Sequence, residues 1–386
     1  MVGDLVAALV FAVWLYLLAG RGGFWLAAER DDRDEPLPPR SWPAVVAVIP
    51  ARNEAETIAQ TVRSLLGQDY PGPLSLVLVD DESQDGTAEV AHRAAEACGA
   101  AARLTVVAGR PLPGGWTGKL WAVKQGIDEA LAHAPPDYLL MTDADISYGP
   151  GALARLVASA ERGGYVLTSL MVKLRCESWA ERWFVPAFVF FFQMLYPFAW
   201  VNRPNHAMAA AAGGCMLVRP AALQAAGGIA AIRGALIDDC ALGAALKARG
   251  PIWLGLTDRV ASIRRYDRIE DIRRMVARSA YAQLRYSPLL LFCAVLGMAL
   301  TYLTGPLFAL FGSGLARGLG IAIWGLMALS FQPMLRFYGR SPLWGVALPA
   351  IALAYMAFTL DSAYQHSRGR GGFWKGRAQA KVAEQP

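Results

Sequence analysis

The stretch LLMTDADISYG, residues 139–149, runs from apolar residues directly into two aspartates, Asp143 and Asp145, one residue apart. This spacing does not assign a function by itself, because it recurs at Asp32 and Asp34 in the charged stretch AERDDRDEPLPP. The two occurrences differ in what precedes them. Only the first follows an apolar run, so we predict that Asp143 and Asp145 lie where a buried strand ends.

Three more short apolar runs precede this one, at residues 44–49, 74–79 and 104–107. They lack the alternation of polar and apolar residues, which is typical of strands covered on both faces. Segments with helical periodicity separate them. Because regular exchange of strand and helix indicates βαβ units, the sequence predicts an α/β, Rossmann-like fold with a mainly parallel sheet.

Polar and acidic segments follow three of these strands: PARNEAE at 50–56, DDESQDGT at 80–87 and TDAD at 142–145. Right-handed crossovers align parallel strands, so these segments should meet at the edge where α/β sheets bind ligands. Converging acids with no His or Cys cluster favour Mg²⁺ or Mn²⁺, which also binds substrate phosphates. We therefore predict a nucleotide diphosphate as partner; the alternative is that the acids are solvated turn residues or helix N-caps.

Long apolar stretches lie near both ends of the 386-residue chain, which is 55% hydrophobic with a mean hydropathy of +0.31. Residues 5–20 carry no charge, and residues 287–314 and 341–360 are similarly apolar. About 20 apolar residues suffice for a membrane span. The middle of the chain is mixed in composition, which predicts a globular domain between membrane segments.

The N-terminal run is expected to be an anchor rather than a secretory signal, since no basic segment precedes it. Arg21 and Arg30 follow it, which places the next domain in the cytoplasm by the positive-inside rule. Five scattered cysteines without a C-x-x-C pair fit a reducing compartment, with neither a zinc site nor a disulfide framework. We predict a multi-pass protein of the cell inner membrane with a cytoplasmic catalytic domain.

A basic segment precedes the C-terminal apolar stretches: residues 259–285 hold eight arginines and three acidic residues. It predicts contact with anionic headgroups. Nucleic acid is the other common partner of basic segments, but no nucleic-acid motif is recognisable, so we expect none. The aromatic-rich stretch 184–200, broken by Pro186 and Pro197, is either an interfacial helix at a lipid entrance or a buried core helix.

The C-terminal topology stays open. Three spans near 288–311, 317–334 and 343–363 would place the tail outside, although SRGRGGFWKGRAQAKV contains five basic residues and should prefer the cytoplasm. Either one segment is re-entrant, with Gly305 and Pro306 interrupting the first span, or the positive-inside rule fails here.

The ordered set VIPARNEAETI, LVDDESQDGT, GGWTGKLWAVKQG, TDAD and IDDCALG resembles family 2 glycosyltransferases with the GT-A fold, over roughly 44–285. Three flanking stretches are similar to the hopanoid-biosynthesis-associated (hopene-associated) glycosyltransferases, a membrane-bound branch. They are RPLPGGWTGKLWAV, ESWAERWFVPAFVFFFQMLYPFAWVN and ARSAYAQLRYSPLLLF. The resemblance implies transfer of a sugar from a nucleotide sugar, with a UDP-sugar as first expectation, to a lipid acceptor.

The resemblance also implies roles for individual residues. Glu54 should line the nucleoside pocket, Asp81 should accept a hydrogen bond from the base, and Asp145 should bind the metal directly. Lys119 opens a helix after a Gly-rich turn and would support the phosphates, or it is an ordinary surface lysine. The implied donor-binding set is Pro50, Arg52, Asn53, Glu54, Asp81, Lys119, Asp143 and Arg278, and the implied metal ligands are Asp145 and Asp143.

In GALIDDCALGAALKARG, residues 234–250, Asp238 replaces the family's usual glutamate and Asp239 matches its catalytic base. Inversion by direct displacement needs a base for the acceptor hydroxyl. The alternative is that one of these aspartates caps the helix that follows. Processive and ceramide-type relatives carry a Q/R-x-x-R-W motif, and the matching stretch here is MVARS, 275–279, which keeps only Arg278. The loss of the other motif residues argues against a polysaccharide synthase. Arg278 is expected to face either the diphosphate or lipid headgroups.

These observations predict a membrane-bound, inverting glycosyltransferase of the hexosyltransferase type with a hopanoid-like acceptor; ceramide, diacylglycerol and polyprenyl phosphate remain open. A membrane-bound nucleotidyltransferase and a non-catalytic scaffold are the alternatives, and Asp239 has no required role in the first. The predicted segments are an anchor (1–28), a GT-A catalytic domain (41–267), a basic interfacial helix (268–287), C-terminal transmembrane segments (288–364) and a basic tail (365–386).

Overall fold

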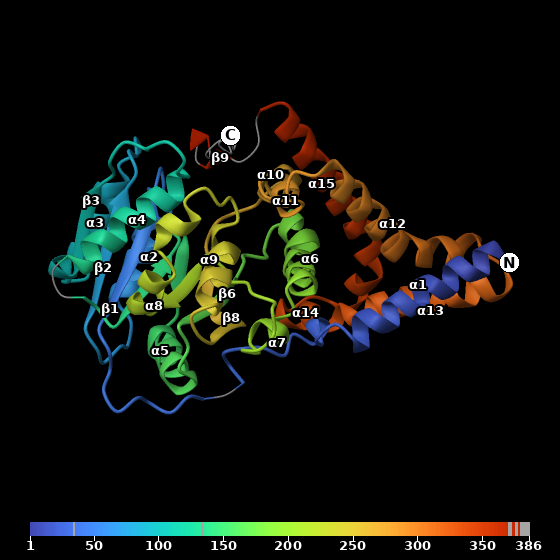
Figure 1. The fold of residues 1–386 in the computed structure, drawn as a ribbon, viewed down its shortest axis with the longest axis horizontal. Helices are drawn as coiled ribbons and strands as arrows, with labels where there is room; N and C mark the ends of the chain where they lie inside the picture. Colours follow the sequence, from blue (N-terminus) through green and yellow to red (C-terminus); the bar gives the residue numbers. More distant parts are fainter. Residues whose placement is uncertain (34, 133–134, 370–372, 375–376, 379–386) are drawn as a thin grey trace. The chain divides into compact units, whose positions relative to one another are not determined.

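Two compact units make up the chain in a computed structural model (Figure 1). The structure describes all residues except 34, 133–134, 370–372, 375–376 and 379–386. We call Met1–Ala28, Cys176–Ala199 and Tyr266–Gly372 the helical unit, and Glu29–Arg175, Trp200–Arg265 and Phe373–Pro386 the sheet unit. Each is therefore assembled from segments that are far apart in the sequence.

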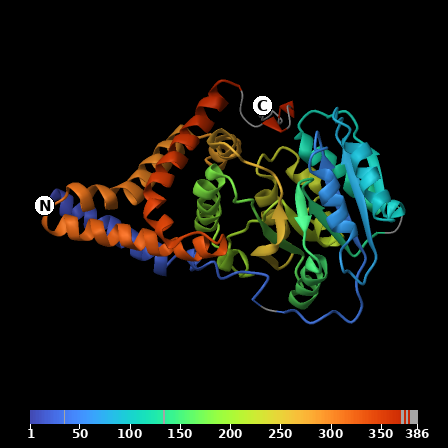
Figure 2. The same cartoon turned by 180° about the vertical axis from the view of Figure 1, so that it is seen from behind.

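The sheet unit is built on an eight-stranded sheet with the order β3-β2-β1-β4-β7-β6-β8-β5 (Figure 2). Its strands are β1 Val45–Ala51, β2 Leu74–Asp80, β3 Leu104–Ala108, β4 Tyr138–Thr142, β5 Ile146–Tyr148, β6 Leu167–Lys173, β7 Cys215–Val218 and β8 Ile252–Ser262. Strands β1 to β4 pair in parallel. In the other half, β7 is antiparallel to β4 and β6, and β5 is antiparallel to β8, while β6 and β8 are parallel. The predicted α/β fold is confirmed, with the parallel part confined mainly to β1–β4.

Strand β1 continues through Pro50, although the sequence predicted that this proline ends the run. Pro50 pairs in register with Val79 of β2, whereas pairing with β4 extends only over Val45–Val48. A proline is tolerated where one side of the strand needs no N–H donor. The strand therefore extends two residues beyond the apolar run, to Ala51, before the loop begins.

Side chains alternate across β1 and pack helices on both faces of the sheet. Val45, Ala47 and Ile49 belong to the main hydrophobic core. Val48 instead faces α4, where a Cβ added to Gly126 would lie 2.5 Å from Val48 Cγ1. Helices around the sheet are α2 Ile58–Leu66, α3 Thr87–Ala97, α4 Gly118–Leu131, α5 Ala152–Gly163, α8 Pro220–Ala225 and α9 Asp238–Lys247, while α7 Phe198–Val201 contains the chain boundary between the two units. The absence of a side chain at Gly126 lets α4 lie close to the sheet.

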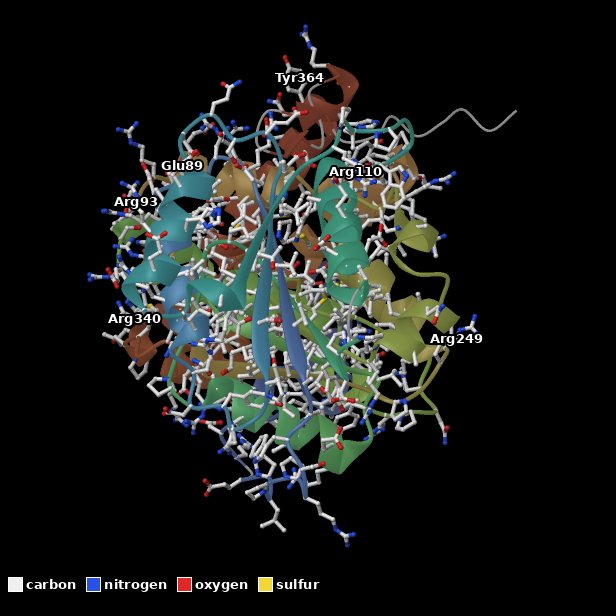
Figure 3. All side chains as sticks on the ribbon, turned by 90° about the vertical axis from the view of Figure 1, so that its left-hand side faces the viewer. Glu89, Arg93, Arg110, Arg249, Arg340 and Tyr364 are labelled. Atoms are coloured by element: carbon white, nitrogen blue, oxygen red, sulfur yellow. The ribbon has the colours of Figure 1, made fainter. Side chains whose placement is uncertain are left out.

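Helix α3 shows why these segments fold as they do. Ala91, Ala94 and Ala95 are buried against the sheet, whereas Glu89 and Arg93 point outward (Figure 3). Apolar residues three and four positions apart share one face of a helix, so this spacing selects a helix with one buried side.

The helical unit contains long apolar helices joined by short ones. Its helices are α1 Val2–Ala19, α6 Trp179–Leu195, α10 Ile269–Ala277, α11 Ala280–Gln283, α12 Pro288–Phe311, α13 Gly314–Ser330, α14 Gln332–Phe337 and α15 Leu348–Ser367. Within the described residues, five segments are long and apolar enough to cross a membrane. They are Val2–Ala19, Trp179–Val201, Pro288–Phe311, Gly314–Phe337 and Pro342–Ser367.

The expected break at Pro186 does not occur, and neither does the interruption at Gly305 and Pro306, which was one of two alternatives for the C-terminal topology. Helix α6 continues through Pro186 and ends at Leu195, before Pro197. Helix α12 continues through Gly305 and Pro306, and a Cβ on Gly305 would lie 2.7 Å from Ile323 Cγ2 of α13. The glycine therefore lets two apolar helices pack closely, as small residues do between membrane helices. Most of the predicted tail, 365–386, lies outside the described residues.

The contact between α4 and the sheet is testable at Gly126. We expect Gly126→Val to lower the stability by about 1–3 kcal/mol, because the added methyl groups overpack against Val48 and Val79. The measurement is the unfolding midpoint of the purified protein in detergent. Gly325→Val is the matched control, since a Cβ at this helical glycine meets nothing within 4 Å. Equal effects in both variants would contradict the close packing of α4.

Candidate active site

The loops that follow β1 and β2 bind each other through backbone and side-chain hydrogen bonds. Asp81 N donates to Ala51 O at 2.8 Å, and Asn53 N donates to Ser83 Oγ at 3.0 Å. Arg52 Nη1 lies 3.6 Å from Oδ2 of Asp81, whose side chain is fully buried. The parallel register of β1 and β2 brings these loops together, so the predicted donor-binding residues Arg52, Asn53 and Asp81 lie in one place.

Lys119 is the second residue of α4 and joins two of the predicted site aspartates. Thr117 caps the helix by accepting a hydrogen bond from Leu120 N at 3.3 Å. Lys119 Nζ lies 2.9 Å from Asp143 Oδ1 and 3.3 Å from Asp238 Oδ2. Its side chain is 19% exposed, so it is not an ordinary surface lysine. Burial acts to lower the pKa of Lys119, but Asp143 and Asp238 raise it overall, and the ammonium group stays charged.

Asp238 and Asp239 are the first two residues of α9, and they have different partners. Asp238 pairs with Lys119, and the N-cap position of α9 is occupied by Ile237 rather than by either aspartate. Asp239 Oδ2 accepts from Gly213 N at 3.0 Å, and its Oδ1 accepts from Cys240 N at 2.7 Å. Burial and the nearby charge of Asp238 raise the pKa of Asp239 to about 6. Asp239 is thus held by backbone amides and tuned toward neutral pH.

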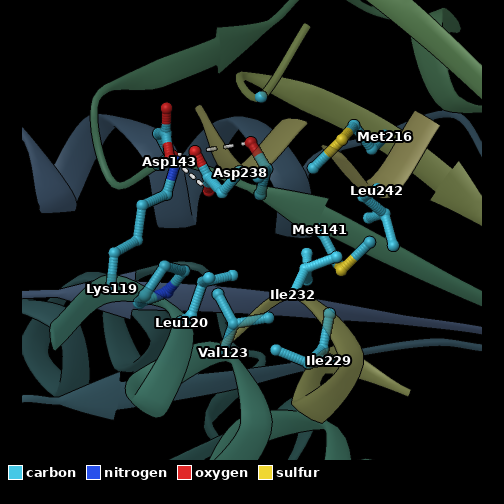
Figure 4. A pocket seen from close by; sticks show the side chains of 13 residues that line it. Lys119, Leu120, Val123, Met141, Asp143, Met216, Ile229, Ile232, Asp238 and Leu242 are labelled. Carbon is cyan, nitrogen blue, oxygen red and sulfur yellow. Dashed lines mark hydrogen bonds and ion pairs between the residues drawn. The ribbon is translucent and has the colours of Figure 1, made fainter. Parts of the chain in front are cut away.

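A small pocket opens beside these ion pairs. Figure 4 shows Lys119 extending between Asp143 and Asp238, while aliphatic and methionine side chains line the opposite wall. The pocket is lined by Pro50, Lys119, Leu120, Val123, Met141, Thr142, Asp143, Gly213, Met216, Ile229, Ile232, Asp238 and Leu242. It therefore combines a charged rim with an apolar interior.

Asp145 is held on the other side of the Asp143–Asp145 loop by an arginine that the sequence analysis did not select. Arg264 Nε lies 2.6 Å from Asp145 Oδ2, and its Nη2 lies 2.6 Å from Glu54 Oε1. The sequence groups Arg264 with the arginines expected to contact lipid headgroups, whereas in the structure its guanidinium pairs with Asp145 and Glu54. In the sequence, Arg264 lies two residues after the end of β8, and this strand was not among the predicted ones.

The residue set fits a hard divalent cation. Asp143 and Asp145 are carboxylates on one short loop between β4 and β5. In the described part of the chain, no group of three or more His, Cys, Asp or Glu side chains is arranged so that it could hold a metal ion by itself. Mg²⁺ typically takes one or two carboxylates and completes its shell with substrate phosphates and water. Burial and the charge of Asp145 raise the pKa of Asp143, although Lys119 opposes this effect. A bound cation would relieve the repulsion between the two carboxylates.

Two family models match this chain. The model described as "Glycosyl transferase family 2" matches residues 46–227, and the one described as "Glycosyl transferase family group 2" matches 138–359. The chain belongs to glycosyl transferase family 2. The predicted family and the predicted enzyme class, a glycosyltransferase, are therefore confirmed.

Relatives of this glycosyltransferase match about a third of the chain. An undecaprenyl-phosphate 4-deoxy-4-formamido-L-arabinose transferase of Enterobacter sp. is 31% identical over 144 residues, 36% of this chain and 39% of that protein. The protein of the same name from Pseudomonas aeruginosa is 30% identical over 145 residues, 36% of this chain and 38% of the relative. The chain thus matches about two fifths of the length of these relatives.

A solved structure shares the fold. The mannosyltransferase of Pyrobaculum calidifontis, determined with GDP-Man and Mn²⁺, superposes with a TM-score of 0.56 over 97% of this chain and 100% of its own. Its sequence is 18% identical, so the likeness concerns the fold alone. It identifies the sheet unit as a GT-A fold.

Arg278 is the predicted site residue that does not join this cluster by any described contact. It belongs to the helical unit, at the C-terminal end of α10. Its contact with the diphosphate stays a prediction. The other predicted site residues, from Pro50 to Asp239, all lie in the sheet unit of this glycosyltransferase.

The Lys119 ion pairs give a stability prediction. We expect Lys119→Met to destabilise the glycosyltransferase by about 1–2 kcal/mol, less than for fully buried pairs because the partners are partly exposed. Lys124→Met is the control on the same helix; its pair with Asp128 is exposed and should contribute less than about 0.5 kcal/mol. Denaturant unfolding in detergent measures both. Indistinguishable effects would mean that Lys119 is not central to the acidic cluster.

Proposed function

We propose that this protein transfers a sugar, with inversion, from a nucleotide sugar to a lipid acceptor at the cytoplasmic face of a membrane. One observation carries the proposal: Asp143, Asp238 and Asp239 surround Lys119 at the carboxyl edge of a GT-A sheet. Lys119, which would bind the phosphates, is then adjacent to Asp239, which would act as the base. Displacement at an anomeric carbon requires both groups to lie close to the reacting atoms. A UDP-sugar is the first donor to test.

Asp145 and Asp143 are the residues that would hold Mg²⁺ or Mn²⁺. When bound, the metal supplies positive charge that stabilises the departing nucleotide diphosphate. Support comes from the hard oxygen donors described above and from the Mn²⁺ and GDP-Man in the mannosyltransferase with the same fold. Lys119 provides a second positive charge at the same edge, close to Asp143.

Asp239 is proposed to take the proton of the acceptor hydroxyl. Gly213 N and Cys240 N fix its two oxygens, and no cation pairs with it directly among the described residues. With its pKa raised to about 6, its carboxylate is available at neutral pH and is more basic than an exposed aspartate. A nucleotidyltransferase, the competing activity, would not need a base at this position.

The acceptor is proposed to be a lipid alcohol, with a hopanoid-like lipid as the first candidate. Five apolar helices and the undecaprenyl-phosphate relatives support a lipid acceptor of some kind. A lipid alcohol and a lipid phosphate differ in one respect as sugar acceptors. An alcohol must lose its proton during transfer, whereas a phosphate oxygen is already ionised near neutral pH. The Asp239 requirement therefore distinguishes a lipid alcohol from polyprenyl phosphate.

The deciding experiment uses purified protein with native lipid extract, Mg²⁺ or Mn²⁺, and labelled nucleotide sugars. A new glycolipid from the wild type, lost in Asp145→Ala, would identify donor and acceptor together, and the anomeric configuration would test inversion. Turnover of no donor, with nucleotide binding unchanged by Asp145→Ala, would contradict a metal-dependent transferase and favour a scaffold. Separate assays with a hopanoid alcohol and with polyprenyl phosphate identify the acceptor class.

Asp239→Asn should lower transfer to a lipid alcohol by about 10²–10⁴-fold, the usual contribution of a general base. In the wild type the rate should be constant above the raised pKa, about 6, and fall as pH decreases through it, since protonated Asp239 cannot accept a proton. The measurement is the pH profile of kcat/KM. A full-rate Asp239→Asn variant would exclude Asp239 as the base and favour a phosphate acceptor or the nucleotidyltransferase.

A further inference from the structure

Arg264 occupies the position between the nucleoside side and the metal side of the proposed site. Its guanidinium bridges Glu54 and Asp145, both at 2.6 Å. The side chains of Glu54 and Asp145 are each only 10% exposed, and that of Arg264 is 31% exposed. Two mostly buried carboxylates need a positive charge, and in this state the arginine provides it.

The backbone around Arg264 is fixed to the Asp145 loop. Ser262, at the end of β8, pairs with Ile146 of β5, and Ile263 N donates to Asp145 O at 2.9 Å. Arg264 N donates to Ser262 Oγ at 3.3 Å. The base of the side chain therefore stays beside Asp145, and only the long side chain can move.

A divalent cation on Asp145 would lie close to this guanidinium. Two positive groups on one carboxylate repel each other strongly at the low effective dielectric of a mostly buried site. A nucleotide diphosphate changes this balance, because its oxygens accept both a metal ion and a guanidinium, which matches phosphate geometry well. Metal and arginine are then compatible only when the diphosphate is present.

We propose that Arg264 is a placeholder for the divalent cation on Asp145, so that the metal binds tightly only together with the nucleotide. This inference rests on the proposed metal-dependent function. Arg264 competes with the metal for Asp145 in the free protein and turns toward the diphosphate when both arrive. The arginine thereby couples metal binding to donor binding and keeps the acidic loop ordered before either is present.

The test is a titration of the detergent-purified full chain with Mn²⁺, followed by the electron paramagnetic resonance signal of free Mn²⁺, with and without UDP. Arg264→Gln should bind Mn²⁺ alone at least about fivefold more tightly than wild type, and UDP should raise its Mn²⁺ affinity by a smaller factor. Arg259→Gln removes the same charge from an exposed position on β8 and should leave both affinities unchanged. Adding Asp145→Asn to Arg264→Gln should abolish the gain.

Unchanged or weaker Mn²⁺ binding by folded Arg264→Gln would overturn the proposal and make Arg264 a positioning residue for Asp145. Circular dichroism establishes folding. If this variant does not fold, Arg264→Lys serves instead, because an ammonium group cannot hold Glu54 and Asp145 as a planar guanidinium does. Its Mn²⁺ affinity should then lie above that of wild type. Absence of Mn²⁺ binding in every variant, even with UDP, would overturn both this inference and the proposed metal, while glycolipid formation by the wild type tests sugar transfer separately.

Discussion

The acidic edge of the sheet depends on two bridging cations, Lys119 and Arg264. Carboxylates that are largely removed from water cannot stay close together as anions unless positive charge compensates them. Lys119 brings α4 into contact with the Asp143 loop and with α9 through Asp238. Arg264 connects the segment after β8 to the loops that carry Glu54 and Asp145. Each cation thus joins elements that are distant in the sequence, and together they determine the geometry of the proposed site.

The parallel half of the sheet and its acidic loops could be predicted because their signals are local. A short apolar run without alternation predicts a strand covered on both faces, and the residue that ends the run marks the edge where the loops meet. Asp143, Asp145 and Asp81 were found in this way. Arg264 could not be found, because its contact with Asp145 spans 119 residues and requires the antiparallel pairing of β5 with β8. Nothing in the periodicity of either strand specifies that pairing, and a cluster of eight arginines beside an apolar stretch resembles a membrane-surface segment.

The helical unit shows a different limit of sequence reasoning. Gly and Pro are reliable signals for helix ends in polar segments, where water satisfies the exposed backbone groups. In an apolar helix an interruption would leave those groups unsatisfied, so the helix continues and the glycine is used for packing. Gly305 against Ile323 is such a case, and α6 passes through Pro186 for the same reason. Arg273 of α10 belongs to the basic segment that was expected to contact headgroups, and in the structure it pairs with Glu270 and Asp361 within the helical unit.

The carboxylates of the site divide into two kinds by their partners. Asp143, Asp145, Asp238 and Glu54 each contact a cationic side chain, which ties their positions to Lys119 or Arg264. Asp239 has a different environment: two backbone amides orient its oxygens, and burial beside Asp238 raises its pKa to about 6. A carboxylate with a raised pKa accepts a proton readily, which supports the proposed role of Asp239 as the base. In the proposed mechanism the first two residues of α9 therefore have different tasks: Asp238 pairs with Lys119, and Asp239 takes the proton of the acceptor.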